Sequence, residues 1–322
     1  MRRFVAALLG ALPLAAGAEA LEWLQRMNEA VRQTTYEGVA VYRSGHQLET
    51  LRVFHQYAGG EERERIYSLS GQPREVLRHA EEVTCILPDQ KVVLVDHQGL
   101  RGLLPKLPRT AFERLRSHYE MSELPHSSRI AGRSCTGIRI ASRDQYRYSY
   151  EIWLDKETAL PLDIKLLGED GSLLEQVVFT QIGYPESLSD EQFTPEVDVS
   201  DFQRVQQTVS DRAIQDDQPL WELAEMPAGF RLATRELQRL PGVAQPVTLL
   251  HYTDGLAAVS VFTAPQTLPE QALEGLTRFG GVNAYGRMLD QYHITVVGEV
   301  PQATVRHFGD NLRRVSGQQV SQ

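Results

Sequence analysis

The residues that come closest to a metal-ligand or acid–base set lie in the segment HYEMSELPH. This segment contains His118, Glu120, Glu123 and His126. Metal ligands on a helix usually stand three or four positions apart, and Pro125 interrupts any helix that would align these side chains. We therefore interpret them as surface side chains and assign neither a metal site nor a cofactor.

Sequence motifs for other reactions are missing as well. The chain contains no G-x-S-x-G nucleophile elbow, no H-E-x-x-H, no glycine-rich phosphate loop and no C-x-x-C pair. Asp211, Asp216 and Asp217 lack the glycine-turn spacing of a calcium loop. An enzyme would need residues brought together from distant parts of the chain, so we expect a binding protein and assign no catalytic residues.

One segment combines basic and apolar chemistry, and it runs from Leu100 to Arg116. It carries five lysine and arginine side chains and one glutamate, in a chain whose formal net charge is −9. Two prolines break it, and Thr110 is placed to cap a short helix after them. The candidate lipid-binding residues are the apolar Leu100, Leu103, Leu104, Leu107, Phe112 and Leu115 and the cationic Arg101, Lys106 and Arg109.

Two interpretations of this segment fit the pattern equally well. As the flap of an amphiphile pocket, its leucines would contact acyl chains, and its cations would bind head-group phosphates, arginine better than lysine. As an ordinary loop and helix, it would only close one end of a hydrophobic core.

Cys85 and Cys135 are the two cysteines of the chain, and both lie in strand-like sequence. In an oxidising compartment they could form a disulfide, closing a loop of about 50 residues and contributing ~3 to 4 kcal/mol in the chain-entropy model. The alternative is two separately buried thiols that pack as small apolar side chains. The sequence leaves both alternatives open.

Length and composition limit the framework that could carry these segments. A chain of 322 residues predicts about two domains, and 42% hydrophobic with 23% charged residues is typical of a globular protein. Its acidic balance makes it a poor binder of nucleic acid.

The first 20 residues predict a secretory signal peptide. Arg2 and Arg3 precede an apolar run, and small residues allow cleavage after Ala18 or Ala20. The run is shorter than the roughly 20 residues needed to cross a bilayer. No cysteine follows it at a position for lipid attachment, so we expect an exported, soluble mature protein.

Periodicity after the leader predicts one helix and then many short strands. The helix covers residues 21–33, with Leu24, Met27 and Val31 on one face. Polar or glycine-bearing turns separate the following strands, which indicates an antiparallel meander curled around a hollow.

The segment from Arg147 to Leu167 predicts a long hairpin within that sheet. Its first strand alternates strictly, with Tyr148, Tyr150, Ile152 and Leu154 on one face and Arg147, Ser149, Glu151 and Trp153 on the other. Arg147 is one of five arginines between positions 129 and 147. We expect most of them to be solvated, and recognition of a partner carboxylate is the less favoured alternative.

The second half predicts a smaller domain of different composition. Residues 205–218 are polar and proline-bounded, so we divide the chain into domains over 21–204 and 219–316, with a tail over 317–322. In the second domain we expect a hairpin of two to three residues at Asp254-Gly255, a short helix over 268–276 and a closing helix over 302–312. The predicted fold class is mainly β with α+β, a curved antiparallel half-barrel followed by a smaller α+β domain.

Four blocks, in one order and spacing, carry a family resemblance. They are RYSYEIWLDKETALPL in the hairpin, EMPAGF, YTDGLAAVSVF and ITVVGEVPQAT. With them, the chain resembles the MucB/RseB family of periplasmic regulators of sigma-E/AlgU type sigma factors, in which the first domain is LolA-like. The resemblance implies no catalytic residues.

The resemblance also implies a mechanism and partners. It implies a negative regulator that binds the periplasmic domain of an RseA/MucA-like transmembrane anti-sigma factor and shields it from site-1 proteolysis. Lipopolysaccharide or an acylated lipid would release it. The alternative is a LolA-like lipoprotein or lipid carrier, although carriers of that type have a single domain. The lipid species, the exact peptide and the oligomeric state, a homodimer included, are left open.

Overall fold

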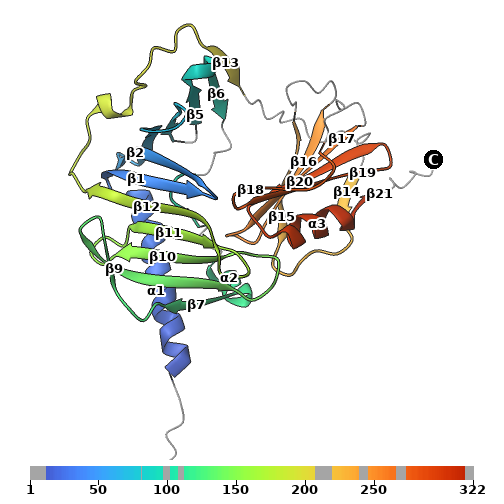
Figure 1. The fold of residues 1–322 in the computed structure, drawn as a ribbon, viewed down its shortest axis with the longest axis horizontal. Helices are drawn as coiled ribbons and strands as arrows, with labels where there is room; N and C mark the ends of the chain where they lie inside the picture. The colour runs from blue at the N-terminus through green and yellow to red at the C-terminus, as the bar shows by residue number, and fades with distance from the viewer. Residues whose placement is uncertain are drawn as a thin grey trace, which may run out of the picture.

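The structure, a computed structural model, describes residues 12–80, 82–96, 102–107, 112–206, 220–238, 246–265 and 273–315. Within them, one sheet of 13 strands forms the first domain, and a six-stranded and a two-stranded sheet form the second (Figure 1). The predicted fold class, a curved antiparallel sheet followed by a smaller α+β domain, is confirmed. The exact domain boundaries stay predictions, because residues 207–219 lie outside the described part.

The first sheet is a long meander. Its strands are β1 (Tyr36–Ser44), β2 (Gln47–Ala58), β3 (Glu61–Ser68), β4 (Glu75–His79), β5 (Glu82–Leu87), β6 (Val92–Asp96), β7 (Tyr119–Glu123), β8 (Ser128–Ile130), β9 (Arg133–Ser142), β10 (Ser149–Asp155), β11 (Pro161–Leu167), β12 (Leu173–Gly183) and β13 (Gln203–Gln206). Their order is β13-β6-β5-β4-β3-β2-β1-β12-β11-β10-β9-β7, with β8 beside β9. All pairs are antiparallel except β13 with β6. Residues 205 and 206, at the start of the expected linker, therefore belong to a strand.

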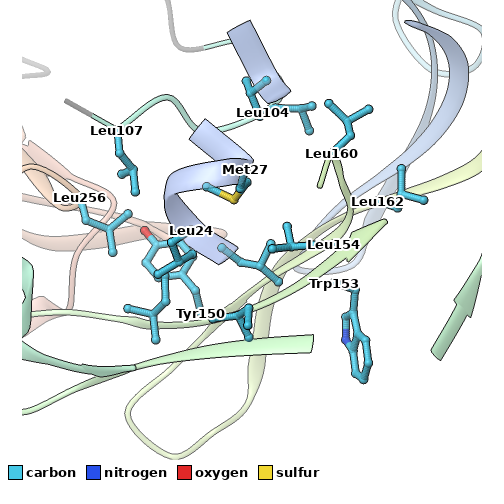
Figure 2. Packing of buried hydrophobic residues seen from close by; sticks show 14 of the residues in the cluster. Leu24, Met27, Leu104, Leu107, Tyr150, Trp153, Leu154, Leu160, Leu162 and Leu256 are labelled. Carbon is cyan, nitrogen blue, oxygen red and sulfur yellow. The ribbon is translucent and has the colours of Figure 1, made fainter. Parts of the chain in front are cut away.

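Helix α1 (Leu12–Gln33) lies across one face of this sheet and provides much of its core (Figure 1). Leu24, Met27 and Val31, the predicted apolar face, are fully buried. Figure 2 shows Leu24 and Met27 packed among Leu154, Leu160 and other leucines of the sheet. The predicted helix is confirmed, but it begins upstream of Leu21, within the segment expected to be a leader.

The predicted hairpin is formed by β10 and β11. Tyr150 pairs with Leu166, Ile152 pairs with Ile164, and a bulge near Leu154 brings that residue opposite Pro161. Proline thus begins a strand at an irregular position, where a missing N–H is tolerated. Trp153 was predicted on the opposite face from Ile152, yet it is also buried, and its ring lies against Gly137, where an added Cβ would come within 2.9 Å of it.

The segment after the basic stretch contains a strand that the sequence analysis did not predict. Helix α2 (Phe112–His118) leads directly into β7, the edge strand that holds Glu120 and Glu123. Tyr119 and Met121 are buried and Glu120 is exposed, which is the period of a half-buried strand. The four His and Glu side chains considered as ligands are therefore spread over a helix end, a strand and the following loop.

The second domain consists of β14 (Leu220–Leu223), β15 (Arg231–Gln238), β16 (Val247–Thr253), β17 (Ala258–Pro265), β18 (Gly275–Phe279), β19 (Val282–Leu289), β20 (Tyr292–Gly298), α3 (Gln302–Asn311) and β21 (Leu312–Val315). The larger sheet has the order β15-β16-β17-β20-β19-β18, and β14 pairs with β21. Helix α3 packs on the larger sheet through Phe308, whose ring meets those of Phe230 and Tyr252. The predicted closing helix is confirmed.

Two expectations for this domain are wrong in part. Residues 275 and 276, the expected end of a helix, belong to β18, because they pair with β19; residues 268–272 of the expected helix lie outside the described residues. The turn between β16 and β17 has four residues, Asp254 to Ala257, because Thr253 pairs with Ala258. No helix in the part of the chain that the structure describes is long and apolar enough to cross a membrane.

Candidate functional site

A cavity of about 820 Å³ lies inside the curve of the first sheet. Its apolar wall is contributed by strands from β2 to β6 and from β10 to β12, through Leu51, Ile66, Val76, Leu94, Tyr150, Ile164, Leu166 and Val177. Strands near opposite ends of the sheet order therefore contribute to one hollow. The sheet curls around the cavity, as the many short strands predicted.

Part of the predicted flap borders this cavity. Leu103, Leu104, Lys106 and Leu107 all line it. Leu104 and Leu107 are each only 3% exposed and also pack into the core under α1 (Figure 2). The segment thus both borders the cavity and closes the core. Each of the two interpretations of the sequence therefore describes part of its contacts.

The other predicted lipid-binding residues have different positions. Phe112 and Leu115 of α2 are buried in the core and are not among the residues that line the cavity, so they agree with the core interpretation. Leu100, Arg101 and Arg109 lie outside the described residues. Lipid contact by any member of this segment stays a prediction.

The flap is fastened to the rest of the first domain by polar contacts. The Leu107 N–H donates to Oδ1 of buried Asn28 at 2.9 Å, and Arg32 donates to the Leu107 carbonyl at 3.2 Å. Both partners come from α1. Lys106, the side chain predicted to bind phosphate, is paired with Glu62, and this pair also fastens the flap.

Glu62 is the centre of this tether. Its Oε1 accepts from Lys106 and lies 3.2 Å from Nε2 of buried His55. Burial raises the pKa of Glu62, but the hydrogen bonds and charges of His55 and Lys106 outweigh burial and lower it to about 2. Glu62 is therefore ionised under ordinary conditions and holds the flap by charge as well as by hydrogen bonds.

Two further cations that the sequence analysis missed line the cavity beside Lys106. Arg78 Nε lies 3.4 Å from Glu64 Oε2, and Arg74 Nη2 lies 3.1 Å from Glu49 Oε2. Arg74, Val76 and Arg78 are spaced by two, so their strand places them on one face, and Val76 lies in the cavity wall. That spacing was the signal available in the sequence.

The second domain supplies the remaining wall of the cavity. Gly255 and Leu256 of the β16–β17 turn and Glu299 after β20 line it. Leu256 is 8% exposed and belongs to the hydrophobic core of the first domain, and Figure 2 shows it next to Leu24 and Tyr150. A molecule that fills this cavity would contact both domains.

A buried arginine joins the two domains beside this wall. The Arg147 side chain is 0% exposed, and its Nε donates to Oδ2 of Asp254 at 2.5 Å. It also pairs with Asp144, donates to the Ala228 carbonyl and stands over the ring of Phe230. The expectation of a solvated arginine is wrong at this position, because Arg147 lies in the bend before β10, where Asp254, Ala228 and Phe230 of the second domain cover it.

Other hydrogen bonds complete the junction. Asn283 donates to the hydroxyl of Tyr148 at 2.8 Å, and the Gly281 N–H donates to Glu175 at 2.9 Å. Thr304 of α3 donates to the Tyr146 carbonyl at 2.9 Å. The junction is therefore polar and specific rather than a sliding apolar contact.

The blocks that carried the family resemblance meet at this junction. RYSYEIW contributes Arg147, EMPAGF contributes Ala228 and Phe230, and YTDGLAAVSVF contributes Asp254. Gly229, between Ala228 and Phe230, has φ +87°, and a Cβ there would lie 2.4 Å from the His118 ring. Only glycine fits this position without displacing its neighbours.

The cysteines do not form a disulfide in the structure. Cys85 on β5 and Cys135 on β9 are free and buried, and Cys85 borders the cavity. Burial raises the pKa of both thiols, that of Cys135 to about 11. The structure therefore contains the alternative in which two separate thiols pack as small apolar groups, because their strands are far apart in the sheet order.

Comparison with known proteins gives similarity along almost the whole chain. A family model described as the MucB/RseB N-terminal domain matches residues 19–197, and one described as the MucB/RseB C-terminal domain matches residues 215–313. The sigma factor AlgU regulatory protein MucB of Pseudomonas aeruginosa is 32% identical over 315 residues, which is 95% of this chain and 94% of that protein. The sigma-E factor regulatory protein RseB of Escherichia coli (strain K12) is 28% identical over 90% of this chain and 89% of its own length.

Solved structures agree with the sequence similarity. The complex of Pseudomonas aeruginosa MucA and MucB matches with a TM-score of 0.72 and 31% identity, covering 93% of this chain and all of that one. A crystal structure of MucB matches with a TM-score of 0.65 and 28% identity, covering 92% and 98%. Both likenesses cover more than nine-tenths of this chain. The chain therefore belongs to the MucB/RseB family.

Proposed function

We propose that this protein is a negative regulator of an envelope-stress sigma factor. It binds the periplasmic domain of a MucA-like anti-sigma factor, shields that domain from site-1 proteolysis and is released by an envelope lipid. The observation that carries the proposal is the shared cavity, because Gly255 and Leu256 of the second domain complete a pocket formed by the first. A bound lipid would thus contact the surface that distinguishes a regulator from a simple carrier.

The relatives support the partner part of this proposal. A structure of MucB in complex with MucA(peri) matches this chain with a TM-score of 0.70 and 30% identity over 92% of its length. The MucB relative is named as a regulatory protein of the sigma factor AlgU. A periplasmic location of the mature protein is consistent with this partner and with the signal-peptide pattern of residues 1–20.

The cavity supports the lipid part. Its wall is largely aliphatic, and each buried methylene of an acyl chain stabilises a complex by about 0.8 kcal/mol. Arg74 and Arg78 line the same cavity, and arginine matches phosphate and carboxylate oxygens well. An acylated molecule with an anionic head group, such as lipopolysaccharide, fits this combination.

A LolA-like lipid carrier is the second candidate, and the cavity alone would suit it. The second domain favours the regulator, because a carrier needs only one hollow. The buried Arg147–Asp254 pair fixes that domain against the first through a specific contact. Nothing in this arrangement requires catalysis, and we propose a binding function only.

A cleavage-protection experiment tests the proposal. The purified mature protein is mixed with the periplasmic segment of a MucA-like anti-sigma factor and a site-1 protease. We expect binding in solution and slower cleavage of the segment, and we expect a dansyl-labelled fatty acid to restore cleavage. A protein that binds the fatty acid but neither binds nor protects the segment would contradict the regulator and favour the carrier.

A further inference from the structure

The turn from Asp254 to Ala257 makes two contacts with the first domain that serve different purposes. Leu256 fills space at the cavity wall and in the core of that domain. Asp254, two residues earlier, accepts a hydrogen bond at its Oδ2 from Nε of the buried Arg147, at 2.5 Å. One short turn therefore connects the cavity to the buried ion pair of the domain junction.

The Asp254 carboxylate couples these two contacts mechanically. Its Oδ1 accepts the N–H groups of Leu256 at 2.8 Å and Ala257 at 2.7 Å, which fixes the turn. Its Oδ2 accepts from Arg147 and, at 3.1 Å, from the hydroxyl of Tyr119. Because one small rigid group holds both sides, the backbone of Leu256 cannot shift far while Asp254 stays on Arg147.

We propose that this turn is the sensor of cavity occupancy. An acyl chain that enters the cavity displaces Leu256, the turn moves with it, and Asp254 leaves Arg147, which loosens the second domain. This inference rests on the proposed function for its biological meaning, since it names the regulation of the same site. It adds the residues through which a lipid in the first domain would act on the second.

Burial of the Arg147–Asp254 pair favours two discrete positions of the turn over a continuous range of positions. The Arg147 and Asp254 side chains are 0% and 1% exposed. Arg147 also pairs with Asp144, but Asp254 is its fully buried carboxylate partner, and losing that partner while the guanidinium stays buried is unfavourable, so intermediate positions of the turn are disfavoured. Two discrete states, docked and released, are the expected result.

Glu175 provides a second contact of the same kind. Its side chain lines the cavity and accepts the Gly281 N–H of the second domain, together with the hydroxyls of Tyr42 and Ser44. The bond between Asn283 and Tyr148, by contrast, joins the domains away from the residues that line the cavity. The junction therefore contains contacts that the cavity can reach and one that serves as an internal control.

Hydrogen–deuterium exchange of the full-length mature protein tests this inference. The probe is a dansyl-labelled fatty acid, and its fluorescence reports binding independently of exchange. On saturation we expect the Leu256 and Ala257 amides, which donate to Asp254, to exchange roughly tenfold faster, within the usual range of coupling between sites. Amides in the centre of β20 should keep their protection. Bound probe with unchanged or slower exchange at Leu256 and Ala257 would overturn the inference.

Variants at two positions separate displacement from binding. Leu256→Ala removes the side chain that the ligand must push, so the exchange response should be lost at probe concentrations that saturate the variant; Leu256→Val should give a reduced response if the alanine variant is too unstable to study. Tyr148→Phe removes a junction hydrogen bond away from the cavity and should respond as the wild type does. A full response in Leu256→Ala or Leu256→Val would contradict the role of this side chain.

The outcome is independent of the partner. The experiment contains no peptide, so failure of the turn to respond would leave binding of the MucA-like segment untouched and would overturn only this inference. Conversely, a protein whose turn responds to the probe but that fails to bind the segment would support the sensor and contradict the proposed function alone.

Discussion

Arg147 shows what a residue pattern can and cannot predict. Alternation predicted a strand that begins at Arg147, but β10 begins at Ser149 and Arg147 lies in the bend before it. The burial of Arg147 depends on Asp254, which is more than a hundred positions away in the sequence. Alternation assigns a face, but it does not reveal which other domain covers that face.

We expect Asp254→Asn to destabilise the protein strongly. The amide keeps the shape of the carboxylate but leaves the fully buried Arg147 without the charge of Asp254, so unfolding should become easier by about 3 to 5 kcal/mol. Urea denaturation measures this difference. As a matched control, Arg139→Gln removes the half-exposed ion pair with Glu151 and should cost less than about 1 kcal/mol. Equal losses of unfolding free energy in the two variants would show that the Arg147–Asp254 pair stabilises the protein no more than an exposed ion pair does.

Glu62 predicts a pH dependence of stability. Its pKa is about 2 in the folded protein and near 4.5 when unfolded, so the unfolded state binds the proton more readily. The contribution of Glu62 is therefore fully present above about pH 4.5 and is lost as the pH falls towards 2. After allowance for solvent screening of a partly exposed pair, it should amount to ~1 to 2 kcal/mol. Glu62→Gln should flatten the stability profile in this window, and an unchanged profile would contradict the tether.

At the scale of elements, local signals predicted most of the first sheet. The three turns from β1 to β4 contain glycine at positive φ, such as Gly59 and Gly60, whereas the two turns from β4 to β6 contain Ala80 and Lys91 at positive φ. Each of these strands pairs with its neighbour in sequence. The missed strands are short, and several pair with distant segments: β13 with β6, and β14 with β21. Such pairings need the folded chain, so a local pattern cannot predict them.

The flap allows a prediction at the same scale. Leu103 lines the cavity and is only partly buried, so Leu103→Asp should lower the affinity for the dansyl-labelled fatty acid about tenfold while the protein stays folded. Leu104→Ala is the control for core packing, because Leu104 is almost fully buried and its truncation should cost about 2 to 5 kcal/mol of stability. Fluorescence titration and thermal unfolding separate the two effects. Unaltered probe affinity in folded Leu103→Asp would remove the flap from the binding site.

Two arginines that line the cavity extend the prediction of which residues bind a lipid head group. Arg101 and Arg109 remain candidates, but Lys106 is engaged by Glu62, and β4 with its preceding residue presents Arg74 and Arg78 to the cavity. Arg74→Gln should weaken binding of a phosphorylated glycolipid and reduce the salt dependence of that binding. Arg139→Gln, on the exposed surface, should leave both unchanged. If Arg74→Gln behaves like Arg139→Gln, this arginine does not contact the head group.

At the scale of the whole molecule, the two domains are not independent modules. Leu256 of the second domain completes the core of the first, and Arg147 of the first depends on Asp254 of the second. A fragment that ends near residue 204 would expose apolar surface and leave Arg147 without that partner. We therefore expect such a fragment to be markedly less stable than the full chain in thermal unfolding, and a fragment as stable as the whole protein would contradict a structural role for the junction.

Calorimetric titration of the full-length mature protein with the periplasmic segment of a MucA-like anti-sigma factor tests the proposed regulation most directly. It is done in the absence and in the presence of saturating dansyl-labelled fatty acid. We predict that the segment binds without the lipid and that saturating lipid lowers its affinity by roughly 5- to 150-fold. Because coupling is reciprocal, the segment should weaken binding of the fatty acid by the same factor. A segment that does not bind, or an affinity that saturating lipid leaves unchanged, would contradict the proposal that this protein binds a MucA-like segment and is released by lipid.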